Sequence, residues 1–221
     1  MDPVVQDILN AAMAEFAQHG LAGARVDVIA RRTRTSKRML YYHFASKEGL
    51  YAAALAHAYE RVRNAQPMPA LAHLPALQAL RAYVGHVFDM HVAHPEFVHM
   101  VMGENLLGAR FVRATPPILQ ANLLGLEVLQ RILERGQAEG AVDAALRVID
   151  VYTNTVALAF HFVSNRPTFS AIFEQGVDPA QVQAERRAAI VDTIERQVLP
   201  RPVAPARRGA LRVSAGLARR A

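Results

Sequence analysis

The sequence predicts an all-α protein built from two sets of helices, and three observations lead to this fold class. Apolar residues recur at helical spacing along most of the chain, whereas runs that alternate apolar and polar residues are short. Several of the expected helices begin with proline, which is favoured at the first helical position. A Pro-rich stretch at residues 64–75, NAQPMPALAHLP, separates a shorter set of helices from a longer one. We therefore expect one domain at residues 1–63 and another at residues 76–199.

Composition narrows the class of protein further. The chain has 221 residues, of which 52% are hydrophobic and 20% charged, and it contains no cysteine. Disulfide frameworks, thiolate zinc sites and cysteine nucleophiles are thereby excluded, and a reducing cytoplasm fits. The N-terminus lacks the pattern of a signal peptide, and the most apolar window, residues 155–163, is too short to span a bilayer. We expect a cytoplasmic protein with no membrane partner.

Four helices are expected in the first domain. Asp2 as N-cap and Pro3 as first helical residue start the first helix, and Gly20 stops it. Thr35 or Ser36 can cap the third helix, and Ser46 can cap the fourth. The expected spans are about residues 3–20, 26–33, 37–43 and 46–63.

Basic residues are unevenly distributed. The formal net charge is +6, and residues 201–221 contain six arginines and no acid. Within residues 25–47, seven Lys and Arg side chains accompany a single acid, Asp27. Such a local excess is typical of a surface that binds a polyanion. The segment at residues 200–221 is low in complexity, and we expect a disordered basic tail.

The segment SKRMLYYHFASKEGLY, residues 36–51, places polar and aromatic side chains on the outside of a short helix. Successive residues of a helix turn by about 100°. If Leu40 points into the core, Phe44 returns to it one turn later, whereas Arg38 and Tyr42 point away. Met39 and Tyr41 then lie on the flanks. This helix would present a surface for contact with another molecule.

The DNA major groove suits such a helix. Arginine can bond bidentately to guanine, and apolar groups can contact the thymine methyl. Lys37, His43 and Lys47, with free backbone N–H groups near Ser36 and Ser46, suit phosphate oxygens. Two short helices at residues 26–33 and 37–43 have the proportions of a helix-turn-helix. A solvated amphipathic hairpin that binds nothing is the alternative interpretation.

The run ILNAAMAEFAQHGLAGARVDVIARRTRTSKRMLYYHFASKEGLYAAAL, residues 8–55, resembles the N-terminal domain of the tetracycline-repressor (TetR) family of bacterial regulators. The resemblance implies an all-α homodimer with a three-helix DNA-binding domain and a larger helical domain that binds an inducer and dimerises. It places Lys37, Arg38, Met39 and Tyr41 where the family reads bases. It places Tyr42, His43 and Lys47 where the family holds phosphates.

Two departures from the family pattern add positive charge near the expected duplex. Arg34 and Thr35 stand in the turn where family members usually have glycine and a small apolar residue, and Arg25 stands where they often have a Ser or Thr cap. The full set of residues expected at the DNA interface is Arg25, Thr35, Ser36, Lys37, Arg38, Met39, Tyr41, Tyr42, His43 and Lys47.

Five longer helices are expected in the second domain, and the resemblance there extends only to layout and a few short runs. Polar residues on their apolar faces are candidate ligand contacts, namely His91, Glu104 and Asn122. Each can also be a core residue whose polar atoms are hydrogen-bonded within the protein, or a surface residue. The expected spans are about residues 76–93, 95–107, 116–137, 146–165 and 179–199.

A polar stripe lies on the helix expected at residues 146–165. It contains Asp150, Asn154, His161 and Asn165 within roughly 60° of the helix circumference. The stripe fits a water-facing surface or dimer rim, because polar stripes on helices usually face solvent. It also fits a pocket wall, so Asn154 and His161 join the candidate ligand contacts.

The last helix is the candidate dimer element. Ile190, Val191, Ile194 and Val198 gather on one side, and with the preceding helix they would form half of a four-helix interface, as in the family.

A metal site is not expected. His86, His91, His94 and His99 are close in sequence, but His86 and His91 face different ways and Pro95 interrupts the helix. We expect neither a metal nor another cofactor.

The leading hypothesis is a ligand-responsive transcriptional regulator, a repressor that binds a near-palindromic DNA operator as a homodimer and is released by a small-molecule inducer. One alternative is a sequence-indifferent architectural DNA-binding protein that uses the basic tail. The other is an enzyme with His91 and Glu104 as base and acid, although no nucleophile or phosphate-binding loop accompanies them.

Overall fold

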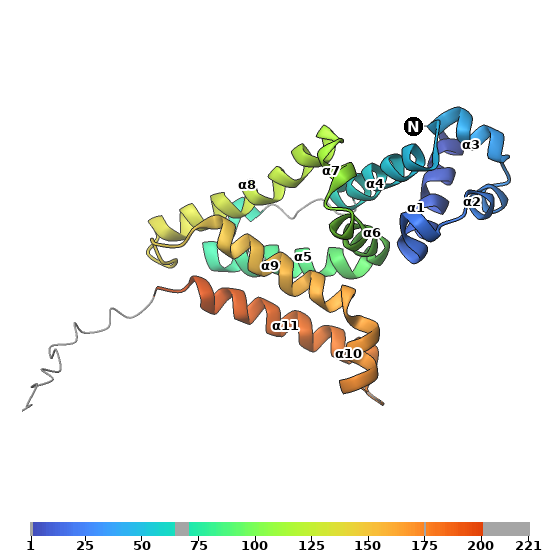
Figure 1. The fold of residues 1–221 in the computed structure, drawn as a ribbon. Coiled ribbons are helices and arrows are strands. Elements are labelled where there is room, and N and C mark those ends of the chain that lie inside the picture. The colour runs from blue at the N-terminus through green and yellow to red at the C-terminus, as the bar shows by residue number, and fades with distance from the viewer. Residues whose placement is uncertain (1, 65–70, 175, 201–221) are drawn as a thin grey trace, which may run out of the picture.

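A computed structural model describes residues 2–64, 71–174 and 176–200, and in these ranges every regular element is helical (Figure 1). Residues 201–221 of the tail expected at 200–221, and residues 65–70 of the linker expected at 64–75, lie outside the described residues. The all-α prediction is confirmed.

The first four helices follow the predicted spans closely. The Asp2 side chain accepts a hydrogen bond from the Val4 N–H at 2.9 Å and so caps the first helix. Gly20, at φ 64° and ψ 176°, breaks the regular turn where the sequence predicted a stop, and a last turn continues to Gly23. The helices are α1 (Pro3–Gly23), α2 (Val26–Arg32), α3 (Lys37–Phe44) and α4 (Lys47–Asn64).

The junction between α3 and α4 requires a glycine. Ser46 Oγ accepts a hydrogen bond from the Gly49 N–H at 2.9 Å, which caps α4 as predicted. A Cβ atom at Gly49 would lie 2.0 Å from the Phe44 carbonyl oxygen. Gly49 therefore allows the end of α3 to approach the start of α4 closely. This close contact fixes the orientation of α3 relative to α4.

The second set contains the five predicted long helices and three short elements that the sequence did not predict. The long helices are α5 (Ala76–Ala93), α6 (Pro95–Leu106), α8 (Pro116–Ala138), α9 (Val148–Ser164) and α11 (Pro179–Val198). The short elements are a 3₁₀ turn η1 (Leu71–His73), α7 (Arg110–Arg113) and α10 (Arg166–Phe173).

One hydrophobic core joins the first four helices to the second set. It contains side chains of α1 to α4, together with Met100 of α6, Phe111 of α7 and Ile118 of α8. Tyr51 of α4 packs edge-on against Phe111, with ring centroids 4.9 Å apart. Helices α1 to α4 thus share a hydrophobic core with the larger helical part, although the linker separates the two parts in sequence.

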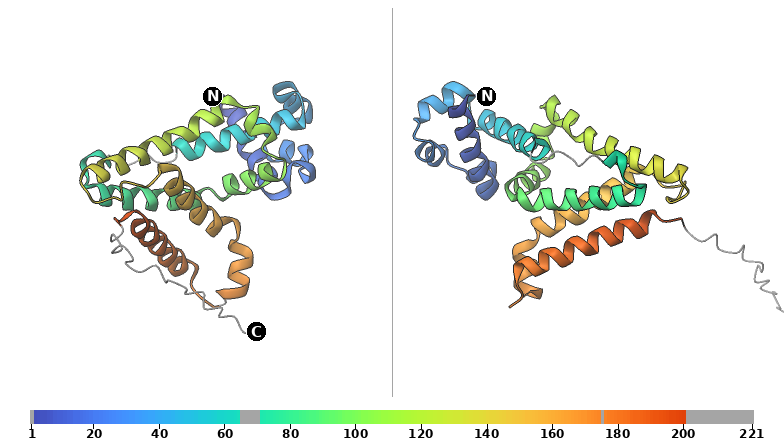
Figure 2. Two further views of the ribbon diagram at one scale, coloured as in Figure 1. Left: turned by 60° about the vertical axis from the view of Figure 1, so that its left-hand side comes forward. Right: turned by 180° about the vertical axis from the view of Figure 1, so that it is seen from behind.

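A second core lies between α5, α8, α9 and α11. In both figures, α11 forms an outer layer beneath α9 and α5, and α10 connects α9 to α11 at one end (Figures 1 and 2). Burial of one apolar face of α11 against α5 and α9 leaves its opposite face uncovered in the single chain.

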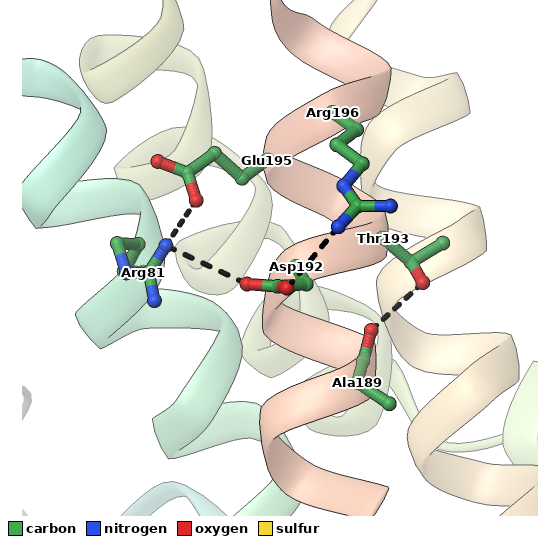
Figure 3. A network of polar contacts seen from close by, with 6 residues as sticks. All are labelled: Arg81, Ala189, Asp192, Thr193, Glu195 and Arg196. Carbon is green, nitrogen blue, oxygen red and sulfur yellow. Dashed lines mark hydrogen bonds and ion pairs between the residues drawn. The ribbon is translucent and has the colours of Figure 1, made fainter.

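Polar contacts also hold α11 to α5. Arg81 of α5 lies between the carboxylates of Asp192 and Glu195 on α11 (Figure 3). About two helical turns further along α5, Asp89 accepts a fork of hydrogen bonds of 2.8–3.0 Å from the Arg187 guanidinium of α11. Exposed ion pairs add little to stability, so the apolar core remains the main attachment and these pairs set the register of the two helices.

Candidate nucleic-acid interface and ligand pocket

Helix α3 is anchored on one side and exposed on the other. Leu40 is 1% exposed, whereas Tyr42 is 80% exposed, Met39 43% and Tyr41 39%. Arg38 is exposed as well. The helical arrangement inferred from the sequence is therefore the one observed. The side chains predicted to read bases are free to meet a duplex, and their contact with DNA stays a prediction.

The start of α3 is fixed by Ser36. Its Oγ accepts a hydrogen bond from the Met39 N–H at 3.2 Å. The Lys37 ammonium lies 3.1 Å from the Asp27 carboxylate of α2. The hydrogen bond between them lowers the pKa of Asp27 and raises the pKa of Lys37. A base or phosphate contact by Lys37 would have to compete with this exposed ion pair.

Lys47 has an intramolecular partner that the sequence did not predict. Its Nζ donates a hydrogen bond to the Ala22 carbonyl at the end of α1, at 3.1 Å. Lys47 therefore links α4 to α1. A contact of Lys47 with phosphate would add to that role or replace it.

The turn between α2 and α3 contains a strained residue. Arg34 has φ 51°, the left-handed region that glycine adopts at lowest cost. The turn geometry that glycine usually provides is thus kept with an exposed arginine, at a cost on the order of 1 kcal/mol. Its guanidinium adds positive charge to the α3 side of the domain.

Glu15 was missed in the sequence interpretation and supports the start of α2. Arg25, at the N-cap, makes no hydrogen bond from its side chain to the helix. Its backbone N–H instead donates to Glu15 Oε1 at 3.1 Å, and Arg32 lies 3.4 Å from Glu15 Oε2. Glu15 is 2% exposed. A glutamate on the apolar face of the first helix was the available signal, because a buried carboxylate needs partners.

His91 is a buried, hydrogen-bonded core residue. It is 3% exposed, and its Nδ1 donates to the Val87 carbonyl at 2.7 Å. Burial lowers the pKa of His91. The rings of Phe97 and Phe160 lie edge-on to the imidazole, at 6.3 and 6.4 Å between centroids. This environment favours a neutral imidazole whose Nε2 is an acceptor.

Glu104 is hydrogen-bonded to the backbone of α7. Its Oε2 accepts hydrogen bonds from the N–H groups of Phe111 and Val112 at 3.0 and 3.1 Å, and the residue is 1% exposed. Burial and then the Glu104 carboxylate raise the pKa of Tyr51. Glu104 thus caps α7 at the contact with α4, and its contact with a ligand stays a prediction.

The remaining ligand candidates are dispersed. The exposed Asn154 donates to Gln197 of α11 at 3.1 Å, so it links two helices. The side chain of Asn122 lies outside the described residues. His161 is exposed on α9, and it alone among the candidates lines the cavity described next.

That cavity lies at the α10 end of the groove between α9 and α11 and has a volume of about 120 Å³. Arg166 stacks over Phe162 at 5.1 Å and is ion-paired with Glu174, whereas Arg186 lies 5.9 Å above Phe169. The wall combines aromatic rings with guanidinium groups. The lining residues are Leu158, His161, Phe162, Arg166, Phe169, Glu174, Arg186, Ala189, Ile190 and Thr193.

The predicted dimer contacts require a correction. Ile190, Val191, Ile194 and Val198 are between 0% and 6% exposed and belong to the second core of the single chain. Side chains buried against α5 and α9 cannot form the surface that meets another copy. The uncovered face between α9 and α11 instead carries small and apolar side chains, namely Ala157, Leu158, Ala189 and Thr193.

Within the described ranges, none of the helices combines the length and the apolar composition that a membrane span requires. In the same ranges, no cluster of three or more His, Asp or Glu side chains is arranged to hold a metal ion.

The fold and the exposed α3 define a helix-turn-helix protein with an attached helical domain. Residues 8–54 match the family profile "Bacterial regulatory proteins, tetR family", and residues 77–194 match "Tetracyclin repressor-like, C-terminal domain". The chain belongs to the TetR family. It is a ligand-responsive, DNA-binding transcriptional regulator.

Individual relatives agree with this assignment. The chain is 33% identical to the HTH-type transcriptional repressor NicS of Pseudomonas putida over 184 residues, which cover 83% of this chain and 86% of that protein. The crystal structure of the transcriptional regulator SCO4942 from Streptomyces coelicolor superposes with a TM-score of 0.66 at 32% identity. That superposition covers 90% of this chain and 99% of the other.

Proposed function

We propose that the protein is a repressor that binds a near-palindromic operator as a homodimer and is released by a small organic inducer. The observation that carries the proposal is α3, where buried Leu40 anchors a helix whose Arg38 and Tyr42 project into solvent. A helix held in this way can enter a major groove without rearrangement of its core. The similarity to a protein named as a repressor supports repression over activation.

Within this proposal, residues 1–63 act as the DNA-binding domain and residues 76–199 as the ligand-binding and dimerisation domain. The inducer would favour a conformer of the dimer in which the spacing between the α3 helices of the two copies no longer matches that of successive half-sites on the DNA. The buried contact between Tyr51 of α4 and Phe111 of α7 supports direct transmission between the two parts.

A non-enzymatic role is part of the proposal. Nδ1 of His91 is bonded to a backbone carbonyl, and Glu104 accepts two backbone N–H groups. A base and an acid for catalysis must both reach a substrate. His91 and Glu104 are only 3% and 1% exposed, and neither lines the cavity between α9, α10 and α11.

The DNA-binding part is tested with promoter fragments of the protein's own gene and its neighbours. Arg38→Ala should weaken binding to the selected operator by about 1–3 kcal/mol and relax the preference at one base position, because it removes a base contact. Arg131→Ala is the matched control, since Arg131 is an exposed arginine of α8, remote in sequence from α3. Footprinting and titrations on operator and random DNA provide the measurement. Equal losses on both DNAs for Arg38→Ala would contradict base reading, and absence of any footprint would reject the regulator.

The homodimer is tested at the uncovered face of α9 and α11. Ala157→Glu places a charge on this face and should convert dimer into monomer, because a buried unpaired charge is strongly unfavourable. Ala138→Glu, at an exposed position of α8, is the control. Sedimentation velocity at micromolar concentration measures the result. If the Ala157→Glu variant remains a dimer, the dimer interface lies on another surface of the protein.

A further inference from the structure

We infer that the cavity between α9, α10 and α11 binds a small aromatic carboxylate. The inference deepens the proposed function, because it names the chemical class of the inducer, and it rests on that function only for the link to DNA release.

The cavity can take no more than one small ring. Its volume of about 120 Å³ is somewhat below the roughly 150 Å³ of a closed apolar cavity that holds benzene. Leu158, Arg186 and Thr193 of its lining are exposed, so the cavity opens to the surface and a ring with a carboxylate would project from its mouth. The rings of Phe162 and Phe169 form part of the wall and provide flat apolar contact for an aromatic ligand.

The charge of the cavity selects an anion. The Arg166 guanidinium is paired with Glu174, so these two groups largely neutralise each other. Arg186 has no carboxylate within ion-pairing distance among the described residues, and its guanidinium lies over the face of Phe169. One positive charge is therefore left over at the wall. A guanidinium held against a ring keeps its N–H groups available for bidentate bonding to a carboxylate.

Two further polar groups line the same space. His161 lies edge-on to Phe169, with ring centroids 6.0 Å apart. The Thr193 hydroxyl donates to the Ala189 carbonyl at 2.7 Å, so its proton is not free for a carboxylate and the guanidinium remains the donor to the anion. An apolar wall with a few convergent polar groups is the usual composition of a small-molecule site.

The position of the cavity relates it to the proposed dimer. Leu158, Ala189 and Thr193 line the cavity and belong to the uncovered face between α9 and α11. Helix α10, which closes one end, has no buried residue of its own. A ligand there would contact an element that can move and a surface that meets the second copy, so its binding can alter the relative orientation of the two copies.

The test uses benzoate as probe on the full chain, with benzyl alcohol as the neutral analogue, in isothermal titration calorimetry. Benzoate should bind with a Kd of about 1 mM or tighter, and benzyl alcohol about tenfold more weakly or not at all, because it lacks the charge. Arg186→Gln should weaken benzoate binding about tenfold or more. Arg196→Gln is the control, because Arg196 is an exposed arginine of the same helix that does not line the cavity.

Four outcomes are informative. Weakened binding in Arg186→Gln and unchanged binding in Arg196→Gln support the site. Absence of benzoate binding at 10-fold the expected Kd, about 10 mM, or equal affinity of the wild type and Arg186→Gln, overturns it. If benzoate binds as expected and leaves operator affinity unchanged, the site stands and the inducer role fails. Operator binding without any benzoate binding leaves the regulator intact and rejects the site.

Discussion

Individual residues show where this chain departs from the simplest helix-turn-helix. Arg34 adopts a left-handed conformation in the turn. Glu15 of α1 accepts a hydrogen bond from the backbone N–H of the N-cap residue Arg25, whereas a serine or threonine N-cap would accept one from an N–H further along α2. Both departures retain the backbone geometry of the motif. They change the charge that the motif presents, and each has a separable effect on stability and on DNA binding.

The strain at Arg34 predicts opposite effects on folding and binding. Arg34→Gly should raise the free energy of unfolding by about 1 kcal/mol, because glycine tolerates a positive φ. The same variant should weaken DNA binding and reduce the salt dependence by about one counterion, because it removes one cation. Urea denaturation and titrations at several salt concentrations measure the two effects.

Arg34→Ala is the matched control for this prediction. Alanine removes the same charge but keeps a Cβ atom, so DNA binding should weaken equally while the free energy of unfolding stays close to that of the wild type. Equal stability of the glycine and alanine variants would show that the left-handed conformation carries no cost.

At the scale of elements, Glu104 joins α6, α7 and α4. Its carboxylate occupies the N-terminal end of α7, a helix of four residues that has no side-chain cap of its own. Short helices are marginal without such contacts. The position of Phe111, which packs against Tyr51 of the DNA-binding part, therefore depends on Glu104.

Replacement of Glu104 by glutamine should lower the free energy of unfolding by about 1–3 kcal/mol, because it removes a charge-assisted pair of hydrogen bonds in a buried place. Chemical denaturation measures the change. Glu127→Gln, at an exposed position of α8, is the control and should change stability by less than about 0.5 kcal/mol. Indistinguishable effects of the two variants would argue against the cap.

For the molecule as a whole, buried histidine makes stability depend on pH. Burial lowers the pKa of His91 in the folded chain, whereas the unfolded chain binds a proton near its ordinary pKa of about 6.5. The unfolded state therefore holds more protons as the pH falls below about 6.5. The stability that neutral His91 contributes is present above that pH and is lost on acidification.

The expected result is a decrease in the free energy of unfolding from pH 7 to pH 5, with a contribution from His91 of up to about 1.4 kcal/mol per pH unit. His91→Phe should make this dependence shallower. His73→Phe, at an exposed position in η1, should leave the slope unchanged. Urea denaturation at three pH values provides the test, and an identical slope in the wild type and the His91 variant would refute the assignment.

The extent of sequence-based prediction follows from the range of the forces involved. Helix spans were predicted well, because caps such as Asp2 and Ser36 and the apolar spacing act within a few residues. The short α7 and α10 were missed, because their stability depends on groups far along the chain or across a loop, such as Glu104 for α7. The orientation of α3 was predictable from a single buried anchor, Leu40.

The sequence by itself determined the family, the all-helical class and the exposed face of the reading helix, since each is encoded in local periodicity or a dense motif. Only the tertiary structure decided the roles of polar residues on apolar faces. His91 and Glu104 became core and capping groups, and His161 came together with Arg186 at one cavity. It also showed that the apolar face of α11 is covered within the chain. An apolar stripe specifies that a helix face must be buried, whereas the partner that buries it depends on how distant helices pack.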